Sequence, residues 1–248
     1  RVRSRSLKQL CPALCDLQMY SPVEARSIPG AQASYAFIAP KARASRKART
    51  PRALPTVLAI SGEEQKHVSK FFRAWRAEER GWQVVVPLRQ KSGTPYLFDQ
   101  AGVDQVVWLM RQILEDDAGK LTPFAVERRK FHLVGTSNGG ASVAAVAAAV
   151  PELVASLTLV TGFIPDTLND FSPLLTILSI RLYVGDEDEM GHCICLQEME
   201  ERIRAVGASV ELFVLEGARH GNIGSHIDMS DFWKGLEASR WIELLRGG

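Results

Sequence analysis

The segment 130–150 constrains the fold and the chemistry of this chain more than any other part. An apolar run predicts a strand, the pattern Gly-x-Ser-x-Gly follows it, and an Ala-rich helix is predicted to begin at once. Such a strand–turn–helix leaves Ser137 at the apex of a sharp turn, with a strained backbone and an exposed hydroxyl. We expect that glycine is required at positions 135 and 139 because the strand and the helix pass too close there for a Cβ. The alternative is a tight turn that carries an ordinary surface serine.

A nucleophilic serine needs a base, and the base needs a carboxylate that orients it. Candidates for both follow Ser137 in the chain order Ser, acid, His that this kind of turn requires. A strand predicted over residues 178–184 leads into a short acidic turn with Asp188, and a strand predicted over residues 209–215 leads into His220. Active sites of open α/β sheets lie at the carboxyl ends of strands, so we expect these three side chains to meet there.

The sequence offers a second candidate for the acid and a second candidate for the base. Asp186 lies in the same Gly-Asp-Glu-Asp turn as Asp188, and either carboxylate could reach the base. His226 lies six residues beyond His220. His220 is the preferred base because it comes directly after a predicted strand and its turn.

The other histidines and the cysteines do not predict a metal site. His132 falls within a predicted strand and is expected to pack in the core, whereas His67 and His192 are expected at the surface. The cysteines form two close pairs without the spacing of zinc ligands, and the pair after His192 is interpreted as part of a helix start. The pairs are Cys11/Cys15 and Cys193/Cys195. A disulfide between the two pairs stays open.

Predicted strands and helices alternate along the chain. This alternation predicts an α/β fold with a mostly parallel sheet that helices cover on both faces. A chain of 248 residues is long enough for one such domain with a full core. Strands are predicted near 34–39, 56–60, 82–86, 130–135, 154–161, 178–184 and 209–215, and helices near 64–79, 101–116, 138–149, 194–206 and 229–245.

With these motifs in this order, the chain resembles the α/β-hydrolase superfamily over residues 33–246. It is similar to small lidless serine esterases, namely the phospholipase/carboxylesterase and acyl-protein thioesterase group and the polyester-depolymerase and feruloyl-esterase group. The resemblance implies the α/β-hydrolase fold without a large cap domain. In the family the acid ends a Gly-x-x-Asp turn, here at Asp188, and the histidine ends a Glu-Gly-x-x-His loop, here at His220.

The resemblance also implies an oxyanion hole made of two backbone N–H groups. One belongs to Asn138, the residue after the nucleophile, at a helix N-terminus that favours negative charge. The other comes from the loop 60–65, where the family usually has His-Gly and this chain has Ser61-Gly62, and it is the N–H of Glu63. Because Ser61 replaces the usual histidine, the resemblance does not predict the rate of catalysis or the class of substrate. The same loop also fits a helix capping box, and both roles are compatible.

The implied activity is hydrolysis of a carboxylic ester or thioester through an acyl-enzyme on Ser137. The segment 162–177 is too short for a helical cap, so the site should be open, with Phe163, Ile164 and Tyr96 along an acyl groove. The expected partner is a small-molecule ester or an acylated substrate, and no cofactor, metal or nucleic acid is expected. Two alternatives remain: a non-catalytic binding member of the fold, and a lyase or perhydrolase that uses the same triad.

The N-terminal part of the chain is basic, with eleven Lys and Arg but only two acidic residues over 1–52. We expect a basic tail over 1–15 and a hydrolase domain over 16–248. The tail has the composition of a transit-peptide remnant, or of a disordered tail. The cluster 41–52 is interpreted as a solvated loop, with binding to an anionic surface as the alternative. No apolar run approaches the roughly 18 residues of a membrane span, which favours a cytoplasmic or organellar location over a membrane-embedded one.

Overall fold

The computed structural model describes residues 23–27, 34–39, 53–62, 75–88, 97–116, 121–122, 124–165 and 167–246. The predicted tail over 1–15, the basic segment 41–52, and two predicted site residues, Glu63 and Tyr96, lie outside the described residues. The division of the chain into a tail and one domain therefore stays a prediction.

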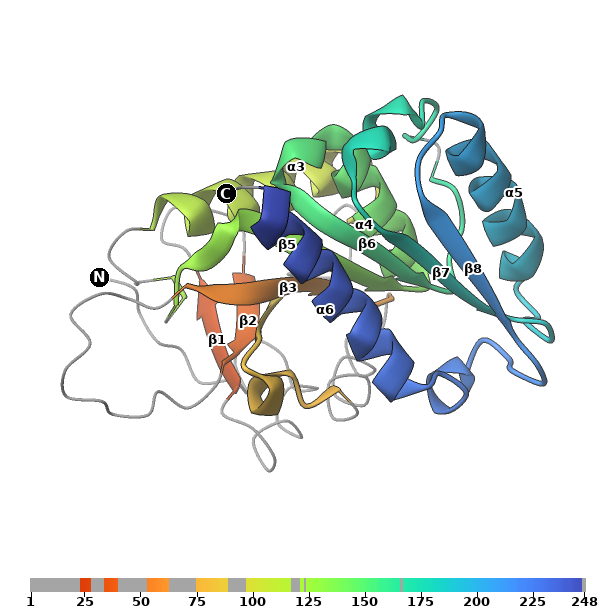
Figure 1. Ribbon diagram of the computed structural model, residues 1–248, viewed down its shortest axis with the longest axis horizontal. Helices are drawn as coiled ribbons and strands as arrows, with labels where there is room; N and C mark the ends of the chain where they lie inside the picture. Colours follow the sequence, from red (N-terminus) through yellow and green to blue (C-terminus); the bar gives the residue numbers. More distant parts are fainter. Residues whose placement is uncertain are drawn as a thin grey trace.

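An eight-stranded sheet forms the centre of the described chain (Figure 1). From edge to edge its strands are β1 (Val23–Ser27), β2 (Ser34–Ile38), β4 (Gln83–Leu88), β3 (Leu54–Ile60), β5 (Val126–Thr136), β6 (Val154–Val160), β7 (Ile180–Gly185) and β8 (Val210–Leu215). β2 pairs antiparallel with β1 and with β4, and all other neighbours are parallel, which confirms the predicted mostly parallel sheet.

Mostly apolar sequences explain the buried strands. Every residue of β3, β6 and β7 is buried, and strands buried on both faces of a sheet are typically rich in apolar residues. Of the strands that the structure describes, β1 alone has no predicted counterpart. Its sequence, Val-Glu-Ala-Arg-Ser, alternates apolar with charged residues, which suits an edge strand but gives a weak signal.

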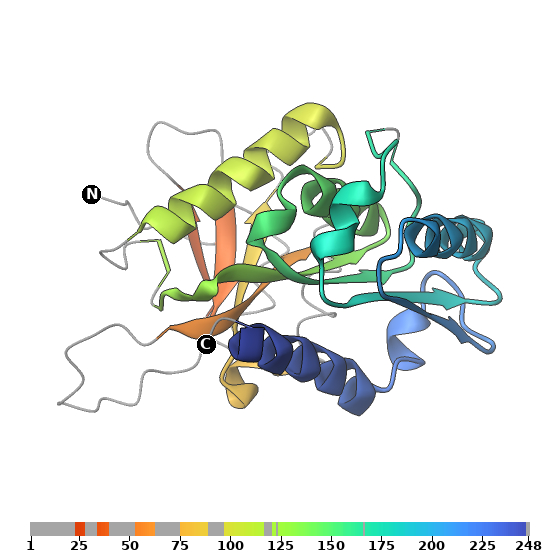
Figure 2. The same ribbon diagram turned by 45° about the horizontal axis from the view of Figure 1, so that its top comes forward.

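Helices cover both faces of the sheet, as predicted (Figures 1 and 2). On one face lie α3 (Gln100–Glu115), α4 (Asn138–Ala149) and α5 (His192–Ala205), and on the other lies α6 (Met229–Arg246), dark blue in Figure 2. The helix predicted over 64–79 falls mostly outside the described residues, and its described end is the short 3-10 helix η2 (Ala77–Arg80). No helix of the described part is both long enough and apolar enough to cross a lipid bilayer.

Two apolar layers hold these helices onto the sheet. Buried residues of α3, α4 and α5 share one cluster, and α6 packs in a second cluster that is rich in aromatic rings. In the second cluster the rings of Trp82 and Trp233 are 5.4 Å apart. α4 is buried almost all round because it consists mainly of Ala, Gly and Val, and small side chains let a helix approach a sheet closely. The turn before α4 is therefore fixed from several sides.

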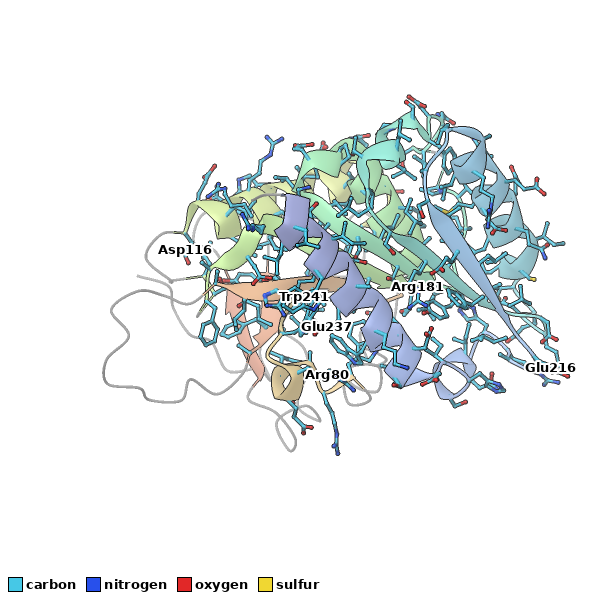
Figure 3. The ribbon with its side chains drawn as sticks, in the orientation of Figure 1. Arg80, Asp116, Arg181, Glu216, Glu237 and Trp241 are labelled. Carbon is cyan, nitrogen blue, oxygen red and sulfur yellow. The ribbon has the colours of Figure 1, made fainter. Side chains whose placement is uncertain are left out.

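A buried arginine links β7 to α6 (Figure 3). Arg181 is only 7% exposed, and its guanidinium donates to Asp231 Oδ2 (2.7 Å) and to Glu211 Oε2 (3.2 Å). The same guanidinium lies 4.6 Å from the centre of the Phe213 ring. Ion pairs and ring contact together satisfy a charge that burial alone would disfavour.

The described residues between β6 and β7 form a loop with one short 3-10 helix, η4 (Ser172–Thr176). Two more 3-10 helices, η3 (Pro151–Leu153) and η5 (Ile223–Ser225), lie in other connections. No cap domain is inserted between β6 and β7 in the described chain, which agrees with the short segment noted in the sequence.

Candidate active site

Ser137 lies at the apex of the turn that joins β5 to α4. Its φ is 54° and its ψ is −126°, a strained combination for a residue with a side chain. A Cβ at Gly135 would overlap the carbonyl of Gly139, and a Cβ at Gly139 would overlap the carbonyl of Ile60. Both glycines are therefore needed for this close approach, as the Gly-x-Ser-x-Gly pattern predicts.

Contacts from β6 hold the apex in place. The backbone N–H of Ser137 lies 3.1 Å from the Val160 carbonyl and 3.2 Å from the Thr161 hydroxyl oxygen, and both can accept its hydrogen bond. The N–H of Thr161 donates in turn to the carbonyl of Tyr183 in β7 (2.7 Å). The serine turn is thus tied through the end of β6 to the next strand of the sheet.

His220 and Asp188 meet Ser137 in one chain of contacts. His220 Nε2 lies 3.0 Å from Ser137 Oγ, and His220 Nδ1 lies 3.2 Å from Asp188 Oδ2. The three residues follow β8, β7 and β5, so they gather at the carboxyl ends of these parallel strands. The side chain of Asp188 is completely buried, whereas that of His220 is 24% exposed. The imidazole is therefore reachable from solvent.

The environment of Asp188 favours its charged form. Burial on its own would raise its pKa, but hydrogen bonds and two neighbouring imidazoles outweigh burial and hold the pKa below its ordinary value. The bonds come from the backbone N–H of Met190, which donates to Oδ1 (2.9 Å), and from His220. A charged carboxylate in this position can orient a neutral imidazole and stabilise an imidazolium.

All four carboxylates of the turn after β7 contact the turn that carries His220. We call residues 186–189 the acidic clamp. Beside the Asp188 contact, it joins Asp186 Oδ1 to the Gly217 N–H (2.8 Å), Glu187 Oε2 to Arg219 Nε (3.0 Å) and Glu189 Oε2 to the His220 N–H (3.3 Å). Of the two candidate acids, Asp188 contacts the imidazole, and Asp186 accepts from a backbone group instead.

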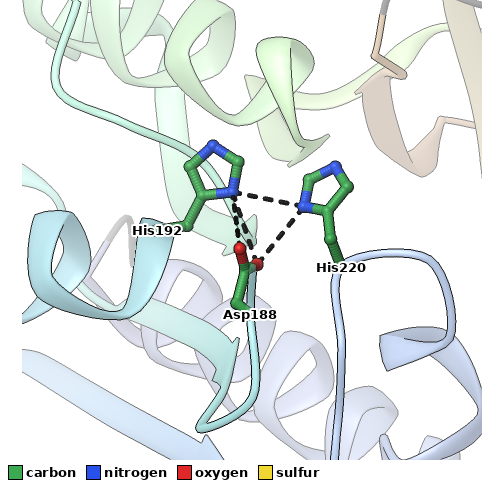
Figure 4. Close-up of side chains that lie close together, drawn as sticks. All are labelled: Asp188, His192 and His220. Atoms are coloured by element: carbon green, nitrogen blue, oxygen red, sulfur yellow. Dashed lines mark hydrogen bonds and ion pairs between the residues drawn. The ribbon is translucent and has the colours of Figure 1, made fainter. Parts of the chain in front are cut away.

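The prediction that His192 lies at the surface is wrong. His192 opens α5 and is only 7% exposed, and its Nδ1 lies 3.3 Å from both carboxylate oxygens of Asp188 and 3.2 Å from His220 Nδ1 (Figure 4). Gly191, at φ 77°, turns the chain so that His192 points back at the residue four positions earlier. Burial lowers the pKa of His192, although the Asp188 carboxylate opposes this shift.

The remaining described histidines lie away from this chain of contacts. His132 is buried, as predicted, and its Nδ1 lies 2.8 Å from Ser156 Oγ. Burial, helped by the charge of Arg240, lowers the pKa of His132 to about 3. His226, the alternative base, is exposed just after η5, and it is His220 that lies against Ser137.

Of the two predicted oxyanion donors, the structure describes Asn138 but not Glu63. Asn138 is the first residue of α4, and the first N–H groups of a helix have no partner within the helix. The Ser61-Gly62 loop runs so close to Ser137 that a Cβ at Gly62 would lie 3.1 Å from the Cβ of Ser137. Glu63 follows this glycine directly but lies outside the described residues.

One of the predicted groove residues borders the site. Phe163 is half-buried, and its ring stacks on that of His192 with centres 6.4 Å apart. The ring of Phe163 also packs nearly perpendicular to that of Phe98, a residue that sequence reasoning missed, with ring centres 5.3 Å apart. Ile164 is half-buried against the apolar core. Tyr96 lies outside the described residues.

Within the part of the chain that the structure describes, one group of side chains could hold a metal ion, and it consists of Asp188, His192 and His220. Cys193 and Cys195 are free thiols. Cys11 and Cys15, the other pair considered for a disulfide, lie outside the described residues.

Comparison with known structures finds many similar folds at low sequence identity. One of two fungal esterases from Rhizomucor miehei matches with a TM-score of 0.67 and 13% identity, over 90% of this chain and 84% of that one. Esterase 2 of Thermogutta terrifontis, in a form phosphorylated by paraoxon, matches with a TM-score of 0.58 and 14% identity, over 92% of this chain and 94% of that one.

A protein assigned as a dipeptidyl aminopeptidase IV from Bacteroides ovatus matches with a TM-score of 0.66 and 11% identity, over 88% of this chain. This chain spans only 36% of that protein. No protein-family model matches the sequence, and no curated protein matches it significantly. The strand order, the covering helices and the structural likenesses together show that the chain has the α/β-hydrolase fold.

Proposed function

We propose that this protein is a serine hydrolase that cleaves a carboxylic ester or thioester through an acyl-enzyme on Ser137. The observation that carries the proposal is the contact chain from Ser137 Oγ through His220 to Asp188, with separations of 3.0 and 3.2 Å. A hydroxyl, an imidazole and a carboxylate in this order form the unit that activates a serine. The strained turn that presents Oγ supports the same role.

The first half of the reaction forms the acyl-enzyme. His220 Nε2 accepts the proton of Ser137 Oγ as this oxygen attacks the carbonyl carbon of the substrate. Asp188 holds the Nδ1–H tautomer of His220 and stabilises the imidazolium that results. The imidazolium then gives its proton to the departing alcohol or thiol, and the acyl group stays on Ser137.

The second half releases the acid. His220 takes a proton from a water molecule, the resulting hydroxide attacks the acyl carbon, and the proton returns to Ser137 Oγ. In both halves negative charge develops on the carbonyl oxygen. Backbone N–H groups of Asn138 and Glu63 are the proposed donors to this oxygen, and such donors are most effective when they are fixed beforehand.

The surroundings of the serine favour an acyl substrate. Phe163 supplies apolar surface beside the histidines, and Ile164 and Tyr96 are the other proposed residues of an acyl groove. The loop between β6 and β7 carries no helical cap in its described part, so an ester of a small molecule or an acyl group on a larger partner could enter. The structural neighbours named as esterases support the ester class.

Labelling and turnover test the proposal. The wild-type protein should react with a fluorophosphonate probe and hydrolyse p-nitrophenyl esters, and a series of rising chain length should show its acyl preference. Ser137→Ala should abolish labelling and lower kcat by several orders of magnitude with the fold intact. Ser230→Ala is the matched control, since Ser230 is an exposed serine at the start of α6.

Each other outcome points to a different function. A Ser137→Ala variant that keeps most of its esterase activity would contradict the proposed nucleophile. A wild-type protein that neither labels nor turns over any ester would be the non-catalytic binding member of the fold. Labelling without ester hydrolysis would favour a lyase or perhydrolase that uses the same side chains.

A further inference from the structure

His192 has no role in the proposed reaction, yet it lies in the centre of the site. Its Nδ1, the Nδ1 of His220 and the Oδ2 of Asp188 form a nearly equilateral triangle with edges of 3.2, 3.2 and 3.3 Å. Figure 4 shows both rings with Nδ1 turned toward the carboxylate and toward each other. Three atoms that can each act as a metal ligand thus lie close together.

Hydrogen bonds account for only part of this triangle. If both Nδ1 atoms carry a proton, both can donate to Asp188, but the two N–H groups then face each other across 3.2 Å. If one Nδ1 lacks its proton, it can accept from the other, but its lone pair then faces the carboxylate. No combination of tautomers makes all three contacts favourable.

A cation at the centre satisfies all three contacts at once. In tetrahedral Zn²⁺ sites the metal lies about 2.0–2.2 Å from nitrogen and oxygen ligands, which places neighbouring ligand atoms about 3.3–3.5 Å apart. The observed edges of 3.2 to 3.3 Å are close to one face of such a tetrahedron. Two imidazoles and one carboxylate are also a donor set that suits zinc.

We propose that Asp188, His192 and His220 bind a divalent transition-metal cation, with Zn²⁺ as the best fit, and that the bound cation switches off the hydrolase. The binding half of this inference stands on the geometry alone, and the inhibition half rests on the function proposed for Ser137. The fourth position of the metal would be filled by water, as in other sites with three protein ligands.

Neighbouring groups support the ligands in the way that metal sites require. The second oxygen of Asp188 accepts the N–H of Met190 (2.9 Å), which fixes the carboxylate, and His220 Nε2 lies 3.0 Å from Ser137 Oγ. The side chain of His220 is 24% exposed, so the group borders the solvent. Gly191, at φ 77°, sets the direction of His192. A Cβ at this position would meet no atom within 4 Å, so the positive φ and not a lack of space favours glycine here.

Metal binding would inactivate the base through its tautomer. In the free enzyme the neutral His220 carries its proton on Nδ1 and presents a lone pair on Nε2 to Ser137. A cation on Nδ1 takes the lone pair there, so the proton moves to Nε2 and the net charge of the ring does not change. Nε2–H then donates to Ser137 Oγ and has no lone pair left to accept its proton.

Direct binding measurements test the site without reference to activity. Titration of the untagged full chain with Zn²⁺ should show one tight site, and Co²⁺ should give the visible absorption of tetrahedral coordination. His192→Phe keeps a ring of similar shape without nitrogen, and it should weaken Zn²⁺ binding by at least about 100-fold. His192→Gln serves as a second variant if the Phe variant does not fold.

Three control variants separate this site from its surroundings. His226→Phe changes an exposed histidine outside the group, and it should leave Zn²⁺ affinity unchanged. Cys193→Ala removes a neighbouring free thiol and should also leave the affinity unchanged. Ser137→Ala should bind Zn²⁺ as the wild type does, because Ser137 is not a ligand, so binding remains measurable even if no hydrolase activity exists.

Activity then tests the inhibition. Zn²⁺ should abolish ester hydrolysis by the wild type at the concentration that fills the site, and EDTA should restore it. In His192→Phe the inhibiting concentration should rise by the same factor as the dissociation constant, with each rate referred to that variant's own metal-free rate. Unchanged Zn²⁺ affinity in both His192 variants, or a loss of binding in Cys193→Ala instead, would overturn the site. Full hydrolysis with the site occupied would overturn the inhibition.

Discussion

The carboxylate of Glu189 accepts a hydrogen bond from the backbone N–H of His220 (3.3 Å), so the turn that supplies the carboxylate partner of the imidazole also holds its backbone. Hydrogen bonds from its own N–H and from that of His220 lower the pKa of Glu189, which favours the charged acceptor. The other members of the acidic clamp act on the same turn. The orientation of the His220 imidazole therefore depends on the backbone contact with Glu189 as well as on the side-chain contact with Asp188.

The two aspartates of the acidic clamp should differ sharply when each loses its charge. Asp188→Asn should lower kcat of ester hydrolysis by several orders of magnitude, because an amide no longer stabilises the imidazolium and can hold the wrong tautomer. Asp186→Asn should have little effect, since its Oδ1 can still accept from the Gly217 N–H. Steady-state kinetics on one ester decide the ranking, and the reverse order would assign the acid to Asp186.

The loop after β3 should tolerate a change of charge but not of backbone shape. Gly62→Val should lower kcat by about 10²–10³, because a side chain there would press on Ser137 and displace the N–H of the next residue. Glu63→Gln is the matched variant, and it should keep the activity or raise it, since the proposed N–H donor remains and the side chain only loses its negative charge. A silent Gly62→Val beside an inactive Glu63→Gln would mean that the carboxylate itself works in the site.

His132 should make the folded state less stable in acid. Its pKa is about 3 in the folded protein and near 6.5 ordinarily, so between these values the unfolded chain binds a proton that the folded chain does not. The free energy of unfolding should therefore fall with decreasing pH, by at most about 1.4 kcal/mol per pH unit from this group. In His132→Gln the decline between about pH 6.5 and about pH 4.5 should be shallower in urea unfolding, and parallel declines would contradict the assignment.

Arg181 should contribute to stability although its partners are partly exposed. Arg181→Met should lower the free energy of unfolding by about 1–2 kcal/mol, because Asp231 and Glu211 lose their partner and Phe213 loses a cation above its ring. Arg76→Met, which removes one exposed ion pair to Glu79, should cost less than about 0.5 kcal/mol. Equal losses in the two variants would show that the buried position of Arg181 adds nothing.

Local sequence patterns were sufficient to predict the serine turn and most of the sheet. The turn at Ser137 is specified by residues within a few positions of each other, and the buried strands β3, β6 and β7 are mostly apolar, with only a few polar residues among them. β1 escaped prediction because its five residues include only Val23 and Ala25 as apolar ones. Its strand character comes from pairing with β2, which no local pattern records.

The second histidine of the site was not predictable in the same way. His192 and His220 are far apart along the chain, and they meet because the parallel register of β7 and β8 brings their following turns side by side. The spacing of four residues from Asp188 to His192 was visible, but a histidine at the start of a helix is more often an ordinary surface residue. Likewise, an acidic run such as 186–189 is usually a solvated turn, and its pairing with the turn after β8 follows from tertiary structure alone.

Thr161 places a limit on how the site can vary. Ser137, the proposed nucleophile, joins β5 to α4, and the proposed acid and base lie in the turns after β7 and β8. β6 lies between these two halves and contributes none of the three side chains. Thr161, at the end of β6, contacts Ser137 with its hydroxyl and Tyr183 with its N–H. Its φ of 53° gives it a backbone shape that few residues adopt readily. Thr161 therefore helps to set the distance between Ser137 and His220, across which a proton would pass, although Thr161 takes no part in the transfer.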